Sequence, residues 1–245
     1  MRVFISFDFD RTLADYSRAH GNSILAGINE TFNNKFYVNW IDLAHSGFTD
    51  LQIIASLVHN QGVSYHHIFD NMNLCLRSIN QKFHEYIYFY PVELLEGAEK
   101  TLQELSYKDD VTIGLSTGNI KSICLSKTKF TGIDEYFSFG SFGNQAFNRY
   151  QLLELTKNRL KQNNNFSKND IAFHIGDSLL DMKAARKTGF IPIGIATGNY
   201  SKVQLLQSGA SFVFNNLNDL NKSFDSILDK LEEKKHYLPI YMQNK

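Results

Sequence analysis

The sequence has few cysteines, no long apolar run and no excess charge, and each of these absences excludes a class of protein. Cys75 and Cys124 are its only cysteines, and they form no CxxC pair, which argues against a disulfide framework or a zinc knuckle. No window approaches the ~20 apolar residues of a membrane span, and the apolar stretch after Met1 is too short for a signal peptide. We therefore expect a cytoplasmic protein with no membrane partner.

Charges of the two signs balance each other. The chain of 245 residues contains 25 Lys and Arg and 25 Asp and Glu, so its composition gives no reason to expect a nucleic acid partner. Hydrophobic residues make up 43% of the chain and charged residues 20%, which is typical of a globular protein. At roughly 150 residues per domain, the length allows one or two domains.

Short β-branched and aromatic runs alternate with helical patterns along most of the chain. The runs are almost continuously hydrophobic, which indicates strands buried on both faces. This alternation predicts an α/β fold with a doubly wound parallel sheet, in which ligands bind at the carboxyl ends of the strands. The expected strands are residues 2–7, 111–116, 171–175, 190–195 and 211–214, and the expected helices are 98–105, 120–129, 150–160, 179–188, 203–208 and 221–235.

Residues 17–90 interrupt this alternation, because they contain no convincing strand pattern. Apolar residues recur there at helical spacing, and Thr49 precedes one of these patterns as a suitable N-cap. We therefore expect a small helical domain inserted after the first strand. The predicted core domain comprises residues 1–16 and 91–225, and residues 226–245 are expected to form a C-terminal helix and tail.

Two acidic residues follow the first predicted strand. In the sequence Asp8-Phe-Asp-Arg-Thr12, the alternation of an extended chain places Asp8 and Asp10 on the same side, at the carboxyl end of the strand. Two carboxylates in one crevice repel each other unless a cation lies between them. Alone, the motif is equally compatible with a solvated acidic turn.

A second acidic pair, Asp177 and Asp181, follows the predicted strand at residues 171–175. Asp177 ends that strand, and Asp181 lies one helical turn further along the same face. Asp177 by itself is also a favourable cap for the helix that follows. Carboxylates that converge from two strand ends suit a hard cation such as Mg²⁺, so the two motifs together favour a metal site.

In their order along the chain, these motifs resemble those of the haloacid dehalogenase-like phosphohydrolases. The pattern consists of Asp8-x-Asp10-x-Thr12, Thr117-Gly118-Asn119, Arg149 after Phe142-Gly143, and Gly176-Asp177-x-x-x-Asp181. Residues 115–210 resemble the phosphoglycolate-phosphatase-like branch most, and the insertion resembles the helical cap of that branch. The resemblance covers the chain up to about Leu220.

The resemblance implies the chemistry of the acidic residues. Asp8 would be the nucleophile that forms an aspartyl-phosphate, and Asp10 would be the general acid and then the general base. Asp8, the backbone carbonyl of Asp10 and Asp177 would bind Mg²⁺. Asp181 would lie in or just behind that shell of ligands. Members that dehalogenate lack the second acid, so Asp10 favours phosphoryl transfer.

The same resemblance implies which groups bind the phosphoryl oxygens. Thr117, the backbone of Gly118 and the side chain of Arg149 would contact them. Lys121 and Lys157 compete with Arg149 for the role of the cation, and the residues before Arg149 favour it because they match the family pattern.

Other positions depart from the family pattern or have less specific roles. Arg11 stands where the family usually has Gly, and it could face solvent or the cap. The sequence repeats Thr-Gly-Asn at Thr197. Because this repeat follows the motif at Gly176-Asp177, it is more compatible with a strand-to-helix turn than with a phosphate site. In the insertion, Phe48 and Asp50 resemble a cap loop that contacts the substrate, and His20 lies where it could overhang the crevice.

We therefore predict a Mg²⁺-dependent phosphatase that hydrolyses a small-molecule phosphate monoester. A phosphomutase of the same fold is the nearest alternative, and a catalytically silent binding protein is another. The four acids argue against a silent protein, because an inactive site has no reason to keep carboxylates that repel one another. The identity of the ester and the oligomeric state stay open.

Overall fold

The fold is described from a computed structural model that covers residues 2–33, 46–163, 166–167 and 169–237. Within these residues the strands are β1 (Val3–Phe7), β2 (Val111–Thr117), β3 (Phe139–Phe142), β4 (Ile171–Gly176), β5 (Ile191–Ile195) and β6 (Phe212–Phe214). They form a six-stranded parallel sheet in the order β3-β2-β1-β4-β5-β6. The order reverses between β1 and β4, where a ligand crevice is expected. This topology confirms the predicted α/β fold with a doubly wound parallel sheet.

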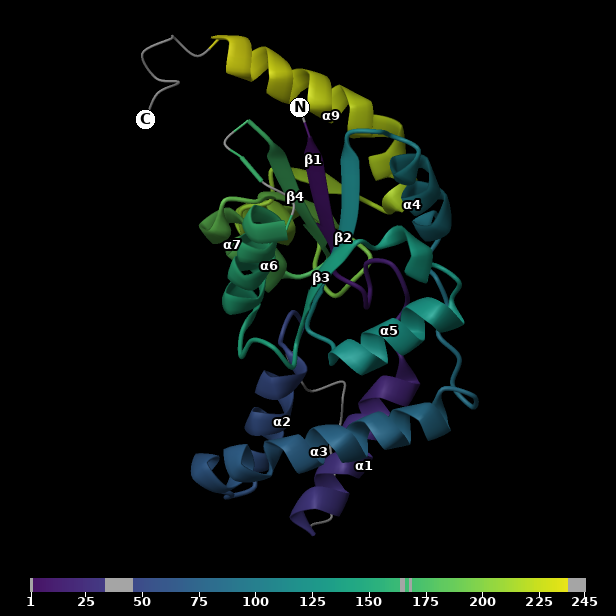
Figure 1. Cartoon of the computed structure of the whole chain (residues 1–245), viewed down its shortest axis with the longest axis vertical. Helices are drawn as coiled ribbons and strands as arrows, with labels where there is room; N and C mark the ends of the chain where they lie inside the picture. The colour runs from purple at the N-terminus through teal and green to yellow at the C-terminus, as the bar shows by residue number, and fades with distance from the viewer. Residues whose placement is uncertain (1, 34–45, 164–165, 168, 238–245) are drawn as a thin grey trace.

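Helices connect the strands and cover both faces of the sheet (Figure 1). They are α1 (Arg18–Phe32), α2 (Asp50–His59), α3 (Tyr65–Tyr86), α4 (Ala98–Ser106), α5 (Lys121–Phe130), α6 (Arg149–Asn163), α7 (Leu179–Thr188), α8 (Lys202–Gln207) and α9 (Leu217–Tyr237), with a 3-10 turn η1 (Asp134–Tyr136). Within the described ranges, no helix combines the length and the apolar character that a membrane crossing needs.

Two elements differ from the prediction. The sequence does not predict β3, because its four residues, Phe-Gly-Ser-Phe, are too few for a periodic pattern and include a glycine. Helix α9 begins at Leu217, earlier than the predicted start at residue 221. Leu217 and Leu220 are buried, so this first turn packs into the core and α9 spans the predicted boundary at residue 225.

Alternate residues of β1 face opposite layers of helices. Val3, Ile5 and Phe7 belong to the larger apolar cluster, which includes residues of α4 and α9, whereas Phe4 belongs to a cluster with residues of α6 and α7. In Figure 1, α6 and α7 lie on one side of the sheet and α4 and α9 lie on the other. The continuous apolar sequence of β1 therefore reflects burial on both faces.

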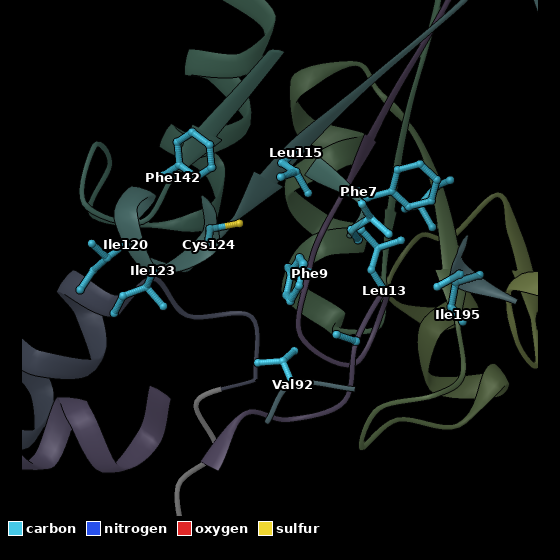
Figure 2. Close-up of a cluster of buried hydrophobic side chains, with 14 of the residues drawn as sticks. Phe7, Phe9, Leu13, Val92, Leu115, Ile120, Ile123, Cys124, Phe142 and Ile195 are labelled. Atoms are coloured by element: carbon cyan, nitrogen blue, oxygen red, sulfur yellow. The ribbon is translucent and has the colours of Figure 1, made fainter. Parts of the chain in front are cut away.

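The apolar residues around the end of β1 fix the direction of the acidic ones. Phe7, Phe9 and Leu13 are completely buried, and Figure 2 shows them within a cluster that also contains Leu115 and Ile195. Because successive side chains of an extended segment point to opposite sides, burial of Phe7 and Phe9 turns the intervening Asp8 and the following Asp10 away from this cluster.

The two ends of the insertion lie side by side in space. The backbone N–H of Asp15 donates to the carbonyl of Glu93 at 2.9 Å, and that of Leu95 donates to the carbonyl of Leu13 at 2.9 Å. Between these points, α1, α2 and α3 lie together beyond the carboxyl ends of the strands (Figure 1). Residues 17–33 and 46–90 contain no strand.

Helices α1 and α3 approach each other closely at Gly27. A Cβ atom there would overlap Cγ1 of Ile79 and would lie 2.7 Å from the backbone nitrogen of Ile79. We expect Gly27→Ala to lower the free energy of unfolding by ~1–3 kcal/mol through overpacking. Thermal unfolding measures this loss, with exposed Asn22→Ala on the same helix as the control. Equal midpoints for the two variants would contradict the close packing.

Candidate active site

Three of the predicted acids meet where β1 and β4 end. Phe7 pairs with Ile175 in the sheet, so Asp8 lies beside the turn that carries Asp177. The backbone N–H of Asp8 donates to the carbonyl of Ile175 at 2.8 Å. Asp8, Asp177 and Asp181 are all buried, and one carboxylate oxygen of each lies within 4.8 Å of the other two.

Asp177 is the least compensated of these carboxylates. Its Oδ2 atom is buried and has no hydrogen-bond partner in the part of the chain that the structure describes. Burial, and then the charges of Asp181 and Asp8, raise the pKa of the Asp177 carboxyl well above its usual value. Burial also raises the pKa of Asp8, although Arg149 opposes that shift. An all-oxygen site with unrelieved negative charge fits a hard divalent cation.

Asp181 is held by neighbouring donors on both of its oxygens. Oδ1 accepts from Nε2 of His174 at 3.2 Å and pairs with Nε of Arg149 at 3.1 Å. Oδ2 accepts from the hydroxyl of Ser178 at 2.6 Å and from its backbone N–H at 3.2 Å. Burial alone would raise the pKa of Asp181, but Arg149, His174 and Ser178 lower it to about 2. These contacts favour a position just behind a cation.

Arg149 connects the acidic cluster to the loop of the insertion. It begins α6 and is 4% exposed. Its Nη1 donates to Oδ1 of Asp8 at 3.1 Å and to the carbonyl of Ser116 at 3.0 Å. Its Nε also donates to the carbonyl of Gly47 at 3.1 Å. The guanidinium therefore lies beside the predicted nucleophile.

The other two candidates for this cation lie elsewhere. Lys121 is exposed at the start of α5, where its Nζ lies 5.9 Å from the ring centroid of Phe142. Lys157 donates from Nζ to the carbonyl of Thr188 at 2.5 Å. Of the three cations that the sequence leaves open, the structure brings Arg149 to the acids.

Asp10 contacts a different cation from Asp8. The Nζ atom of Lys127 lies 2.7 and 2.9 Å from the two carboxylate oxygens of Asp10. It also lies 2.7 Å from Oδ1 of Asn119 and 3.2 Å from Nδ1 of His20. Burial raises the pKa of Asp10, but Lys127 and His20 outweigh it and hold that pKa well below its usual value.

Sequence reasoning missed Lys127 and His174, although each leaves a signal in the sequence. Lys127 follows Ile123 and Cys124 at helical spacing, and all three are buried on α5. His174 lies within the otherwise apolar run of β4 and is completely buried beside Asp181. A polar residue on an apolar face is expected to have a buried partner, and here both partners are acids of the site.

The loop after β2 is closely covered by the insertion. Thr117 is buried, and its hydroxyl accepts from Nδ2 of Asn119 at 3.1 Å. Asn119 also donates to Asp10 at 2.8 Å. A Cβ atom at Gly118 would overlap the backbone carbonyl of Phe48. Glycine is therefore needed at position 118 because the insertion passes directly over the loop.

Asp50 and His20 join the insertion to this loop. Oδ2 of Asp50 accepts from the backbone N–H of Ile120 at 2.7 Å and from Nε2 of His20 at 3.0 Å. The backbone N–H of Asp50 donates to the carbonyl of Gly118 at 2.8 Å. Burial lowers the pKa of His20, but Asp50 and the hydrogen bond to Asp10 outweigh it and raise that pKa above its usual value.

One cavity of about 380 Å³ unites most of the predicted residues. The residues of the prediction that line it are Asp8, Asp10, Gly118, Arg149, Asp177, His20, Phe48 and Asp50. Thr117 and Asp181 are buried and are not among the residues that line it. The second Thr-Gly-Asn is more than a turn, because a Cβ atom at Gly198 would overlap Oδ2 of Asp177, so this loop also closes the acidic cluster.

A family model matches most of the chain. A model of the haloacid dehalogenase-like hydrolases matches residues 5–195, a range that includes every acid of the site. A search of curated proteins by sequence finds no match.

Solved structures share the whole fold at low sequence identity. A predicted phosphatase from Clostridium acetobutylicum has a TM-score of 0.70 and 18% identity, covering 92% of this chain and 99% of that chain. A β-phosphoglucomutase from Clostridium difficile has a TM-score of 0.68 and 17% identity, covering 96% and 98%. A hydrolase from Pseudomonas syringae has a TM-score of 0.66 and 18% identity, covering 93% and 99%. At these identities the likeness shows a common fold.

The unpartnered carboxylate of Asp177 predicts an effect on stability. Its pKa is raised in the folded protein, so its ionised form opposes folding and does so increasingly as pH rises through that pKa. Asp177→Asn should therefore stabilise the metal-free protein at neutral pH by ~1–3 kcal/mol. Each kcal/mol should raise the unfolding temperature by about 2–4 °C. Differential scanning calorimetry after chelation measures this shift, with exposed Asp109→Asn as the control.

Addition of Mg²⁺ completes this test. If the acidic cluster binds this ion, Mg²⁺ should raise the unfolding temperature of the wild type and of Asp109→Asn, since a ligand of the folded site stabilises the folded state. It should leave Asp177→Asn unchanged. An equal Mg²⁺ shift in all three proteins would place the ion elsewhere.

Proposed function

Because the chain belongs to the haloacid dehalogenase-like hydrolases, we propose that it is a Mg²⁺-dependent phosphatase acting on a small phosphate monoester. The observation that carries this proposal is that Asp8 and Asp10 line one cavity but contact different cations. Arg149 lies 3.1 Å from Asp8, and Lys127 lies 2.7 Å from Asp10. Two carboxylates in different environments can take the two roles that the reaction requires.

The first step transfers the phosphoryl group to the protein. A carboxylate oxygen of Asp8 attacks phosphorus, and the bond to the ester oxygen breaks. Asp10 donates a proton to the departing oxygen when it enters this step protonated, the form that its contact with Lys127 disfavours. Thr117, the backbone of Gly118 and Arg149 bind the phosphoryl oxygens. Hydrolysis of such esters needs on the order of 20 kcal/mol of catalysis, so positioning and charge neutralisation must act together.

The second step hydrolyses the aspartyl-phosphate. Asp10, now ionised, accepts a proton from water while the water oxygen attacks phosphorus and the bond to Asp8 breaks. Lys127 favours the ionised form of Asp10, because its ammonium group contacts both carboxylate oxygens. Inorganic phosphate leaves, and Asp8 is restored.

The acidic cluster supports the choice of metal ion. Asp8, the backbone carbonyl of Asp10 and Asp177 would hold Mg²⁺, with Asp181 just behind them. When bound, the ion neutralises negative charge on the phosphoryl group. The buried and unpartnered oxygen of Asp177 supports this assignment, because carboxylate oxygens are preferred ligands of Mg²⁺.

Residues 17–90 act as a cap over a core domain of residues 1–16 and 91–225, with residues 226–245 as a C-terminal extension. The covering of Gly118 by the insertion supports this division. A cavity of about 380 Å³ under such a cap suits a small ester and excludes a macromolecule and bulk water. The proposal includes a cytoplasmic location.

A phosphomutase is the second candidate, and a β-phosphoglucomutase is among the structures with this fold. It would return the phosphoryl group from Asp8 to another hydroxyl of the substrate, whereas a phosphatase passes it to water. The fate of the group therefore separates the two activities.

Replacement of the nucleophile tests the proposed reaction. Asp8→Asn should abolish release of inorganic phosphate from p-nitrophenyl phosphate, because it removes the attacking oxygen at nearly constant size. Chelation should abolish release by the wild type until Mg²⁺ is restored. A phosphate assay measures both effects, with exposed Asp15→Asn as the control. Substantial activity of Asp8→Asn would disprove the nucleophile, and transfer to a second hydroxyl would identify a mutase.

The contact between Lys127 and Asp10 predicts an unequal effect on the two steps. Lys127→Met should slow the water step more than the first, because nitrophenolate leaves without a proton whereas water needs an ionised base. We expect a rapid burst of about one nitrophenolate per protein, then turnover slower by roughly tenfold or more. Stopped-flow absorbance measures the burst, and exposed Lys129→Met should show none. Uniform slowing without a burst would contradict a role for Lys127 in the second step.

A further inference from the structure

Arg11 has an unusual backbone conformation for an arginine. Its φ is 60°, in the left-handed region that favours glycine. The backbone N–H donates to the carbonyl of Ala14 at 2.6 Å, and the carbonyl accepts from the hydroxyl of Thr197 at 2.5 Å. An arginine held in such a conformation at the wall of a candidate site suggests a function that offsets the strain.

The guanidinium of Arg11 is held by neutral groups at the wall of the cavity. Its Nη1 donates to Oδ1 of Asn199 at 2.9 Å, and its central carbon lies 6.0 Å from the ring centroid of Tyr16. Arg11, Tyr16 and Asn199 line the same cavity as Asp8. The second Thr-Gly-Asn therefore orients this cation as well as enclosing Asp177.

The charges of the site distinguish Arg11 from the other cations. Arg149 pairs with Asp8 and Asp181, and Lys127 pairs with Asp10. Arg11 forms no ion pair with any residue that the structure describes. Its positive charge is half-buried at the cavity, and the groups that it contacts there, Asn199 and Tyr16, are neutral.

We propose that Arg11 binds a second negatively charged group of the substrate, so that the preferred ester has a carboxylate or a phosphate on its leaving group. The proposal rests on the proposed function for the position of the reacting phosphate. Asp10 would protonate the leaving oxygen, and Arg11 lines the same cavity as Asp10. A guanidinium recognises carboxylate and phosphate alike through paired hydrogen bonds.

Two substitutions separate the charge of Arg11 from its backbone. Arg11→Gly removes the charge and suits the left-handed φ, so the fold should be retained or stabilised. Arg11→Lys keeps a positive charge but loses the paired donors. Arg18→Gln removes an exposed charge from the start of α1 and serves as the control. Thermal unfolding of each variant checks that it is folded.

The first measurement compares kcat/KM for matched esters. Phosphoglycerate against glycerol phosphate tests a carboxylate, and fructose bisphosphate against fructose phosphate tests a second phosphate. We expect the wild type to prefer, in at least one pair, the ester that carries the second anionic group. Arg11→Gly should reduce that ratio about tenfold to a hundredfold, Arg11→Lys should reduce it less, and Arg18→Gln should leave it unchanged. A ratio that Arg11→Gly does not change would overturn the proposal.

The second measurement does not depend on turnover. Isothermal titration in Mg²⁺ compares methylphosphonate with phosphonoacetate and with methylenediphosphonate, which add a carboxylate and a second phosphonate. The wild type should bind phosphonoacetate or methylenediphosphonate more tightly than methylphosphonate, and Arg11→Gly should lose this preference. That result supports the site even if no ester is hydrolysed. If this binding is observed but no ester is hydrolysed, the proposed function fails and the role of Arg11 in binding stands. Equal binding of all three ligands by the wild type and by Arg11→Gly would overturn the inference while leaving hydrolysis untouched.

Discussion

Repulsion between buried carboxylates is the constraint on which the arrangement of this site depends. One carboxylate oxygen of each of Asp8, Asp177 and Asp181 lies within 4.8 Å of the other two, and such a cluster is stable only when its charge is compensated. Arg149 divides its guanidinium between Asp8 and Asp181, and His174 supports Asp181 from the sheet. Oδ2 of Asp177 has no hydrogen-bond partner among the described residues. The core thus compensates most of the charge itself and leaves one place for a cation.

Sequence reasoning finds residues whose position follows from local geometry and misses those whose partners are remote. Asp8 and Asp10 are predicted because the period of an extended chain and the burial of its apolar neighbours determine their direction. Lys127 is missed because its partner Asp10 lies 117 positions away, so its place on the apolar face of a helix does not identify the acid that it contacts. His174 is missed although Asp181 lies only seven positions away, because a single polar residue within an apolar strand does not indicate which residue it contacts. The short strand β3 has too few residues for any period to be detected.

The insertion is part of the site as well as its cover. Asp50 binds the loop after β2 through backbone groups of Gly118 and Ile120, and it also contacts His20, which reaches Lys127. Movement of the insertion away from the core would break these bonds and change the surroundings of Lys127. Access to the cavity and the environment of Asp10 are therefore linked through a continuous chain of hydrogen bonds.

The two ends of the insertion meet at Asp15 and Glu93, and this affects how the substrate range of such proteins can change. The insertion leaves and re-enters the core at one point, and the segment that carries Asp8 and Asp10 is anchored by Phe7 and Phe9 before that point is reached. A different helical module could be exchanged there without altering the spacing of the two acids. Such a graft would need to replace the contacts that Gly47, Asp50 and His20 make with the core, so new substrate ranges are open to recombination of whole modules.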